Sequence, residues 1–181
     1  MTTFGYEQSL GYDRRATRLL TGLYRRIATD IDARTTDSAT VIDLGTGPGK
    51  LLSHLAARRP DLHLHGIDLS PHMIEIARRT LAGHTVELAV ADVSDLPHPD
   101  ASIDLAVSSL SMHEWPDLPA AATELRRVLR PGGTAGIYDF RFARTREIRR
   151  VLGAVFGSVD TETVRLPWHP AAVITCFRVT A

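Results

Sequence analysis

The sequence predicts an α/β protein, in which a mostly parallel sheet is covered by helices on both faces. Short apolar runs of strand length alternate with stretches of helical periodicity along most of the chain, which is typical of repeated strand–helix units. A glycine-rich loop, residues 45–49, follows the first apolar run. Near the C-terminus only a short turn separates two strand-like runs, so we expect an antiparallel pair at the end of the sheet.

Length and composition favour one globular domain. The chain has 181 residues, of which 44% are hydrophobic and 23% are charged, an ordinary soluble mixture. Twenty-one basic residues balance 21 acidic residues, so the formal net charge is zero, which argues against nucleic acid or a membrane surface as a partner. Residues 141–181 carry seven arginines against three acids, which we interpret as a solvated helix face rather than a phosphate or RNA contact.

Cysteine usage and targeting signals predict a cytoplasmic protein. Cys176 is the only cysteine, so no intrachain disulfide and no thiolate zinc cluster can form. No apolar run approaches the ~20 residues that span a membrane, and the charged N-terminus does not resemble a secretory signal. His63 and His65 share one strand face without further ligands nearby in sequence, so we expect no metal site.

The first half of the chain carries clear signals for where its elements begin and end. Pro60 ends one helical stretch, and Ser70 with Pro71 begins another as N-cap and first-turn proline. Gly83 ends that helix. The expected elements are a helix over 14–32, a strand over 40–44, a helix over 51–59, a strand over 62–67, a helix from Pro71 to Gly83 and a strand over 86–91.

In the second half of the chain, strands and helices continue to alternate until a hairpin of two strands ends the pattern. The run Pro131-Gly132-Gly133 closes a helix, because proline and glycine interrupt regular structure. The turn over 167–170 is long enough only for a hairpin. The expected elements are a strand over 103–108, a helix over 118–129, a strand over 135–140, a helix over 144–156 and strands over 161–166 and 173–180.

The glycine loop is the strongest local signal. Its sequence is Asp43-Leu-Gly45-Thr-Gly47-Pro-Gly49, and glycine allows both a tight turn and close approach of backbone to a ligand. The dinucleotide fingerprint needs its third glycine one place later, where Lys50 stands, and the phosphate-binding loop needs Gly-Lys-Ser/Thr, which is absent. A plain strand-to-helix turn remains the alternative for such a loop taken alone.

Acidic residues at the next two strand exits strengthen the case for a ligand site. Asp68 ends the second strand, where a carboxylate can accept both hydroxyls of a ribose. Asp92 ends the third strand, where a carboxylate can accept from an exocyclic amine such as that of adenine. Each acid alone could cap a helix, but open α/β sheets bind ligands at this carboxyl edge.

Five landmarks in order resemble the class I S-adenosylmethionine-dependent methyltransferases, in particular the small-molecule and quinone-type branch. They are Val41–Gly49, Gly66–Pro71, Ala91–Pro97, Ser102–Ser108 and Leu125–Gly133. The resemblance implies a Rossmann-like, seven-stranded, mostly parallel sheet whose last strand is antiparallel. It implies S-adenosyl-L-methionine as cofactor, with the three loop glycines near its methionine part. The cofactor-binding residues expected from it are Asp43, Gly45, Thr46, Gly47, Gly49, Asp68, Leu69, Asp92, Val93 and Ser108.

The same resemblance assigns roles to the acids and divides the chain. Asp43 would orient the loop, Asp68 would hold the ribose, and Asp92 with Val93 would frame the adenine. The chain is then a single methyltransferase domain, residues 1–181, with an N-terminal helical segment or lid (1–37), a cofactor-binding core (38–140) and a C-terminal helix and β-hairpin (141–181). No substrate-capping insertion follows residue 140, so we expect an open pocket that the N-terminal segment or a second subunit, in a homodimer, would complete.

The exit of the fourth strand, Ser108 to Trp115, would face the transferable methyl group. His113 is the candidate general base, because imidazole titrates near neutral pH. The alternative is that His113 packs beneath the cofactor or shapes the substrate site. Tyr12, His113 and Arg141 are the candidate substrate-binding residues; Arg141 could pair with an anionic group or be a solvated charge.

We therefore expect a methyltransferase that transfers a methyl group to a small-molecule acceptor by in-line displacement. The alternatives are a non-catalytic S-adenosylmethionine-binding regulatory module, or a methyltransferase that acts on RNA or protein. A nicotinamide-dependent oxidoreductase is disfavoured by the glycine spacing. Which atom of the acceptor is methylated does not follow from the sequence.

Overall fold

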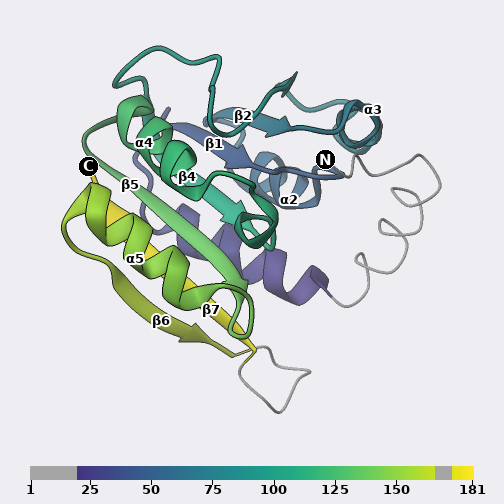
Figure 1. The fold of residues 1–181 in the computed structure, drawn as a ribbon. Coiled ribbons are helices and arrows are strands. Elements are labelled where there is room, and N and C mark those ends of the chain that lie inside the picture. The colour runs from purple at the N-terminus through teal and green to yellow at the C-terminus, as the bar shows by residue number, and fades with distance from the viewer. Residues whose placement is uncertain (1–19, 166–172) are drawn as a thin grey trace.

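A seven-stranded sheet forms the centre of the protein (Figure 1). The structure is a computed structural model that describes residues 20–165 and 173–181. The strand order is β3-β2-β1-β4-β5-β7-β6. The strands are β1 (Thr40–Leu44), β2 (His63–Asp68), β3 (Val86–Val90), β4 (Ile103–Ser109), β5 (Leu129–Phe140), β6 (Asp160–Val164) and β7 (Ile174–Thr180).

The strand directions confirm the expected mostly parallel, Rossmann-like sheet. Strands β1 to β5 pair in parallel, and β7 pairs antiparallel with both β5 and β6. Strand β1 lies between β2 and β4: Asp43 stands opposite Gly66 on one side and Val107 on the other. The order of the strands reverses at this point, and such a switch point is where open α/β sheets bind ligands, beyond the carboxyl ends of the strands.

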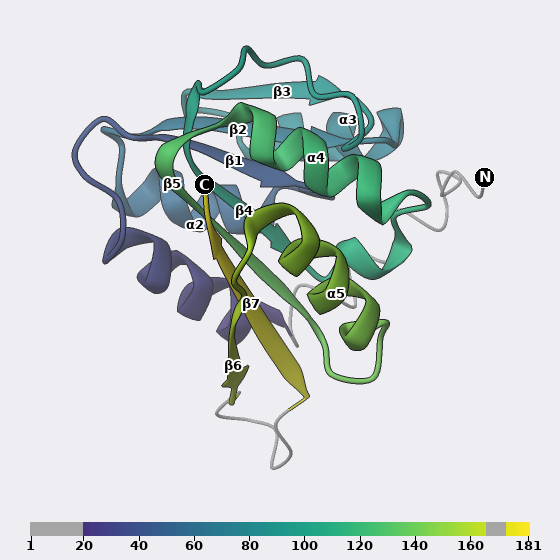
Figure 2. The same cartoon turned by 60° about the vertical axis from the view of Figure 1, so that its left-hand side comes forward.

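Helices cover both faces of the sheet, as Figure 2 shows. The N-terminal helix (described from residue 20 to residue 32), α2 (Lys50–Arg58) and α3 (Pro71–Thr80) bury apolar side chains in one core cluster. The helices α4 (Leu118–Val128) and α5 (Thr145–Phe156) pack into a second cluster on the opposite face. No helix in the described ranges is long and apolar enough to cross a membrane.

Strand β5 begins six residues earlier than its sequence pattern predicts. Helix α4 ends at Val128, and Leu129 already pairs with Ile103 of β4. The register then shifts between Ile103 and Leu105, so that the next pair is Leu105 with Thr134. The Pro-Gly-Gly run therefore lies within an irregular strand instead of a turn, because a register shift can accommodate extra residues on one strand.

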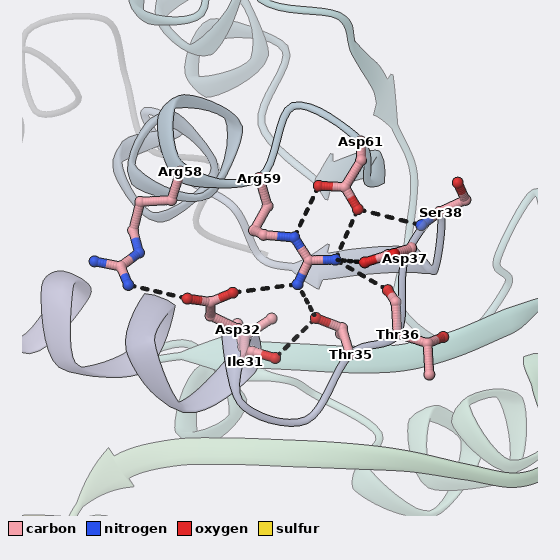
Figure 3. Close-up of polar contacts among 9 residues, drawn as sticks. All are labelled: Ile31, Asp32, Thr35, Thr36, Asp37, Ser38, Arg58, Arg59 and Asp61. Atoms are coloured by element: carbon pink, nitrogen blue, oxygen red, sulfur yellow. Dashed lines mark hydrogen bonds and ion pairs between the residues drawn. The ribbon is translucent and has the colours of Figure 1, made fainter.

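Arg59 joins the end of the N-terminal helix to the turn that follows α2 (Figure 3). Its guanidinium donates to both carboxylate oxygens of Asp61, at 2.8 and 2.7 Å, and to Asp32 at 3.2 Å. It also donates to the Thr35 hydroxyl and the Thr36 carbonyl. Hydrogen bonds from Arg59 hold the pKa of Asp61 well below its usual range. One planar donor group thus links the end of the N-terminal helix to a segment more than 20 residues away in sequence.

A second polar cluster ties the N-terminal helix to the sheet itself. The Tyr138 hydroxyl, on β5, donates to the carboxylate of Asp30. Arg178, on β7, donates to both oxygens of Asp30 at 3.2 and 3.1 Å and to Glu162 of β6 at 2.6 Å. The helix is therefore fastened at Asp30 to two neighbouring strands.

Candidate functional site

A pocket opens at the carboxyl ends of β1 to β4, where the fold predicts a ligand site. It comprises about 1040 Å³ of space, including the part that opens to solvent. The loop after β1, the start of α3, the exits of β3 and β4, and the N-terminal helix all contribute to its wall. The lining residues are Tyr24, Gly45, Thr46, Gly47, Pro48, Asp68, Leu69, Ser70, Met73, Ala91, Asp92, Val93, Ser109, Leu110, Ser111, Glu114, Trp115 and Pro116.

Two glycines of the loop meet different surroundings. Gly45 and Gly47 have φ angles of 71° and 52°, in the left-handed region that favours glycine. A Cβ atom at Gly45 would lie 2.0 Å from the Ser111 Oγ, so the glycine is needed for the loop and the β4 exit to approach each other. A Cβ atom at Gly47 would meet nothing within 4 Å. The backbone at Gly47 therefore borders open space that a ligand can fill.

Asp43 lies behind the loop rather than in the pocket wall. Its side chain is 1% exposed, and its Oδ2 accepts a hydrogen bond from the Thr46 hydroxyl at 2.9 Å. Its Oδ1 has no hydrogen-bond partner among the residues that the structure describes. Burial raises the pKa of Asp43 to about 7, with a further contribution from the negative charge of Asp68. The carboxylate braces the loop through Thr46.

Asp68, at the end of β2, lies in the pocket wall and also holds the loop. Its Oδ2 accepts from the backbone N–H of Gly47 and its Oδ1 from that of Ser70, both at 2.9 Å. Burial raises its pKa, although the two backbone donors oppose that shift. Since each carboxylate oxygen can accept two hydrogen bonds, Asp68 retains the capacity to accept from two hydroxyls of a ligand.

Asp92, after β3, is arranged similarly. Its Oδ1 accepts both from the backbone N–H of Ser94 at 2.9 Å and from the Ser94 hydroxyl at 2.7 Å. These two bonds orient the carboxylate while using only one of its oxygens. Asp92 and Val93 both line the pocket, so the site offers an acceptor beside an apolar contact.

The segment after β4 forms the part of the pocket wall that adjoins Gly45 of the glycine loop. The Trp115 indole N–H donates to Ser111 Oγ at 3.0 Å. Arg144, just before α5, donates to the carbonyl oxygens of Trp115 at 2.9 Å and of His113 at 3.3 Å. Glu147 pairs with the same guanidinium at 2.9 Å. An arginine from the adjacent helix thus holds this wall segment in place.

His113 lies behind the wall, against a buried acid. Its Nδ1 is 2.8 Å from Asp139 Oδ1, and its backbone N–H donates to Asp139 Oδ2 at 2.9 Å. Burial raises the pKa of Asp139, and the contacts with His113 oppose that shift. Sequence reasoning did not identify Asp139 as a partner of His113, because the two residues are 26 positions apart and nothing in the local pattern connects them.

The structure brings most of the expected cofactor-binding residues to one pocket. The residues that line it are Gly45, Thr46, Gly47, Asp68, Leu69, Asp92 and Val93. Asp43, Gly49 and Ser108 lie outside the lining. A Cβ atom at Gly49 would meet Leu81 at 3.0 Å and Ala77 at 3.2 Å, so Gly49 serves the packing of α2 on α3.

The three expected substrate-binding residues are not in the lining. Arg141 is exposed beyond β5, where its backbone N–H donates to the Val173 carbonyl. His113 lies behind the wall, as described above, and Tyr12 lies outside the described residues. Sequence reasoning missed the lining residue Tyr24, because its helical spacing reads as an ordinary core position. Glu114 lies within the expected fourth-strand exit, but no sequence pattern assigns it a role.

The charge of the lining favours a ligand with a positive group. Among described residues the lining includes three acids, Asp68, Asp92 and Glu114, and neither lysine nor arginine. A positive ligand group within such a concave wall is stabilised because low-dielectric surroundings strengthen charge interactions. Over residues 20–165 and 173–181, no group of three or more His, Cys, Asp or Glu side chains is arranged to hold a metal ion.

Comparisons with known proteins agree with the observed fold. A family model described as a methyltransferase domain matches residues 41–133. A demethylmenaquinone methyltransferase of Clavibacter sepedonicus is 33% identical over 163 residues, which cover 88% of this chain and 66% of the relative. A trans-aconitate 2-methyltransferase of Azoarcus is 36% identical over 137 residues, 76% of this chain and 51% of the relative. The chain therefore spans less than two thirds of each of these relatives.

A solved structure is similar over nearly the whole chain. It is a TehB-like SAM-dependent methyltransferase from Corynebacterium glutamicum, with a TM-score of 0.77 and 21% sequence identity. The match covers 97% of this chain and 99% of that chain. At this identity the likeness concerns the fold, including the C-terminal strands.

Proposed function

Because the chain belongs to the methyltransferase domain family, we propose that it transfers a methyl group from S-adenosyl-L-methionine to a small-molecule acceptor. One observation carries the proposal: a single pocket joins the acids at the exits of β2 and β3 to the wall formed by residues 109–116. Cofactor and acceptor would then share one pocket. Holding two reactants in line is worth up to about 7–11 kcal/mol of the activation barrier.

The family and the fold imply S-adenosyl-L-methionine as the cofactor, and the residues present fit it. Asp68 can accept from the ribose hydroxyls, and Asp92 with Val93 can frame the adenine. The open backbone at Gly47 leaves space for the methionine part. The acidic lining complements the positive sulfonium, which supplies the activated methyl group.

The acceptor would lie against the wall formed by residues 109–116. Leu110, Trp115 and Pro116 give this wall an apolar and aromatic character, Glu114 adds one carboxylate, and Tyr24 of the N-terminal helix contributes a second aromatic ring to the pocket. The two curated relatives are named for a quinone precursor and for trans-aconitate, which supports a small-molecule acceptor. The lack of lysine and arginine among the described lining residues argues against a nucleic-acid phosphate at this pocket.

Two measurements test the proposal. Calorimetry with S-adenosyl-L-methionine should show binding that the Asp68→Ala variant loses, whereas NAD should not bind. Incubation with methyl-labelled cofactor should then label the small-molecule fraction of a metabolite extract. Label in an RNA or protein fraction alone would move the acceptor to that class. Tight cofactor binding with no label in any fraction would instead indicate a regulatory module.

A further inference from the structure

His113 is held by an acid that has no access to solvent. The Asp139 side chain is 0% exposed and accepts from the His113 ring at 2.8 Å, from the His113 backbone at 2.9 Å and from the Phe140 backbone at 2.8 Å. An ionised carboxylate can only accept hydrogen bonds. The ring nitrogen Nδ1 of His113, which contacts it, therefore carries a proton. In the neutral imidazole the other nitrogen, Nε2, is then a hydrogen-bond acceptor.

The imidazole of His113 is also fixed in orientation. The ring of Phe140 packs against it edge-on, with centroids 5.9 Å apart and planes at 65°. Arg144 holds the His113 carbonyl at 3.3 Å. Two hydrogen bonds from His113 to Asp139 and one aromatic contact therefore leave the ring little rotational freedom, which is how a carboxylate orients a histidine for proton transfer.

The Nε2 atom of His113 lies near a carboxylate of the pocket wall. His113 Nε2 is 3.8 Å from Glu114 Oε1, and Glu114 lines the pocket with its side chain 57% exposed. Glu114, His113 and Asp139 thus form a row from the pocket to the protein interior. Among the described residues the charged groups around His113 are the two carboxylates and the Arg144 guanidinium on its carbonyl oxygen.

We propose that Glu114 accepts the proton of a hydroxyl acceptor of phenol-like acidity, and that His113 and Asp139 are positioning residues behind it. This inference rests on the proposed function and names the class of acceptor. The acceptor O–H bond breaks, and its proton passes to the carboxylate of Glu114, which lies 3.8 Å from His113 Nε2. The acceptor oxygen forms the bond to the methyl carbon, while the carbon–sulfur bond breaks and its electron pair remains on sulfur. One proton is later released to solvent at the exposed Glu114.

A purely structural role for the His113–Asp139 pair would give different results. The pair could simply hold the wall segment, and substitutions would then lower the methylation rate of all acceptors equally. A proton-accepting role predicts selectivity instead, because an acceptor that is already ionised needs no base. Phenols of different acidity separate the two roles.

The first experiment examines the histidine ring without any acceptor. Nitrogen-15 NMR of the full chain, with the His113 signals assigned through the His113→Gln variant, should show a proton on Nδ1 and none on Nε2 at high pH. Asp139→Asn should remove this preference, whereas Glu114→Gln and the distant, exposed His63→Gln should keep it. A wild-type ring protonated on Nε2 would overturn the proposal, even if the protein binds the cofactor.

The second experiment compares initial rates on 4-methoxyphenol and on the far more acidic 4-nitrophenol. Glu114→Gln should lower the rate on 4-methoxyphenol about 10²-fold or more and the rate on 4-nitrophenol less than about tenfold, and His113→Gln should show the same selectivity. Glu75→Gln, on the exposed face of α3, is the matched carboxylate control and should change neither rate.

The outcomes separate this inference from the proposed function. Equal losses of rate on both phenols in the Glu114→Gln and His113→Gln variants would show a structural role and overturn the proton-accepting assignment. A wild-type protein that labels other small molecules but neither phenol would overturn the hydroxyl acceptor class. Loss of cofactor binding, or of labelling in every fraction, would instead count against the proposed function. Glu114→Gln keeps the test decisive if Asp139→Asn does not fold, because Glu114 is not part of the core.

Discussion

Asp68 Oδ2 accepts a hydrogen bond from the Gly47 backbone N–H at 2.9 Å. The acid at the end of one strand therefore holds the glycine loop that follows the neighbouring strand. The resemblance assigned this acid to the ribose alone. The structure adds a second role for the same carboxylate, since it fixes the loop geometry before any ligand arrives. Preorganisation of this kind lowers the cost of binding.

The two roles of Asp68 can be separated by comparing two substitutions. Asp68→Ala removes all acceptors, and we expect calorimetry to show at least about a 100-fold loss of cofactor affinity, since bonds to a charged group contribute about 1.5–3 kcal/mol each. Asp68→Asn keeps one oxygen that can accept from Gly47, so its loss should be smaller. Unchanged affinity in Asp68→Ala would remove the ribose assignment. Circular dichroism of both variants serves as the folding control.

The glycines of the loop should respond differently to alanine. Gly45→Ala and Gly47→Ala both place a side chain at positive φ, which costs roughly 1–2 kcal/mol. Gly45→Ala also collides with Ser111, so thermal denaturation should show the larger loss of stability for this variant. Gly47→Ala has room for its Cβ and should mainly weaken cofactor binding.

A second substitution checks the cause of the Gly45 effect. Ser111→Gly removes the two atoms, Oγ and Cβ, that would lie 2.0 and 2.7 Å from the new Cβ. The double variant Gly45→Ala/Ser111→Gly should therefore regain part of the stability that Gly45→Ala loses, relative to Ser111→Gly alone. Additive losses in the two variants would show that the close approach of Gly45 to Ser111 is not the reason for the glycine.

Asp43 should make the protein less stable as the pH rises. Its pKa is raised by burial from 3.8 to about 7, so between these values the folded protein holds a proton that the unfolded chain has released. Stability therefore falls as the pH rises through this window and levels off above it. Burial raises the pKa of Asp68 and Asp139 as well, so their contributions have the same sign.

Asp43→Asn tests that assignment, because the amide oxygen can still accept from Thr46. Melting temperatures measured from pH 4 to pH 8 should fall less steeply in Asp43→Asn than in the wild type. The exposed Asp160→Asn, on β6, is the matched control and should leave the slope unchanged. If the melting temperature of Asp43→Asn falls with pH as steeply as that of the wild type, the assignment to Asp43 is contradicted.

Arg59 should matter more for stability than an ordinary surface arginine. Its guanidinium is 15% exposed and joins Asp32, Asp37 and Asp61. Lysine keeps the charge but not the planar set of donors, so Arg59→Lys should lower the melting temperature by about 2–6 °C. The Arg58 side chain is 50% exposed and pairs with Asp32, so Arg58→Lys should lower the melting temperature less. Equal effects would show that the geometry of the guanidinium is unimportant.

Local patterns account for what the sequence predicted well. The helix start at Ser70 was correct, because an N-cap serine and a first-turn proline act within a few residues. The acids Asp68 and Asp92 reach one pocket because parallel strands end at the same edge of a sheet. These inferences needed the order of the elements and no knowledge of how side chains pack.

Contacts between distant segments account for what the sequence could not predict. Asp139 stands in an apolar strand, and only the pairing of β4 with β5 brings it to His113. The early start of β5 at Leu129 follows from a register shift that the Pro-Gly-Gly pattern conceals. The place of Glu114 in the pocket lining likewise depends on which way the loop after β4 turns, which periodicity does not encode.

Consecutive residues of β5 serve opposite faces of the sheet. Tyr138 fastens the N-terminal helix through Asp30, and Asp139 holds His113 behind the pocket wall. Since side chains alternate along a strand, inserting or deleting one residue in β5 would exchange the two faces. Such a change would release the helix and the histidine together. The length of β5 therefore ties the anchoring of a helix on one face of the sheet to the placement of a histidine on the other.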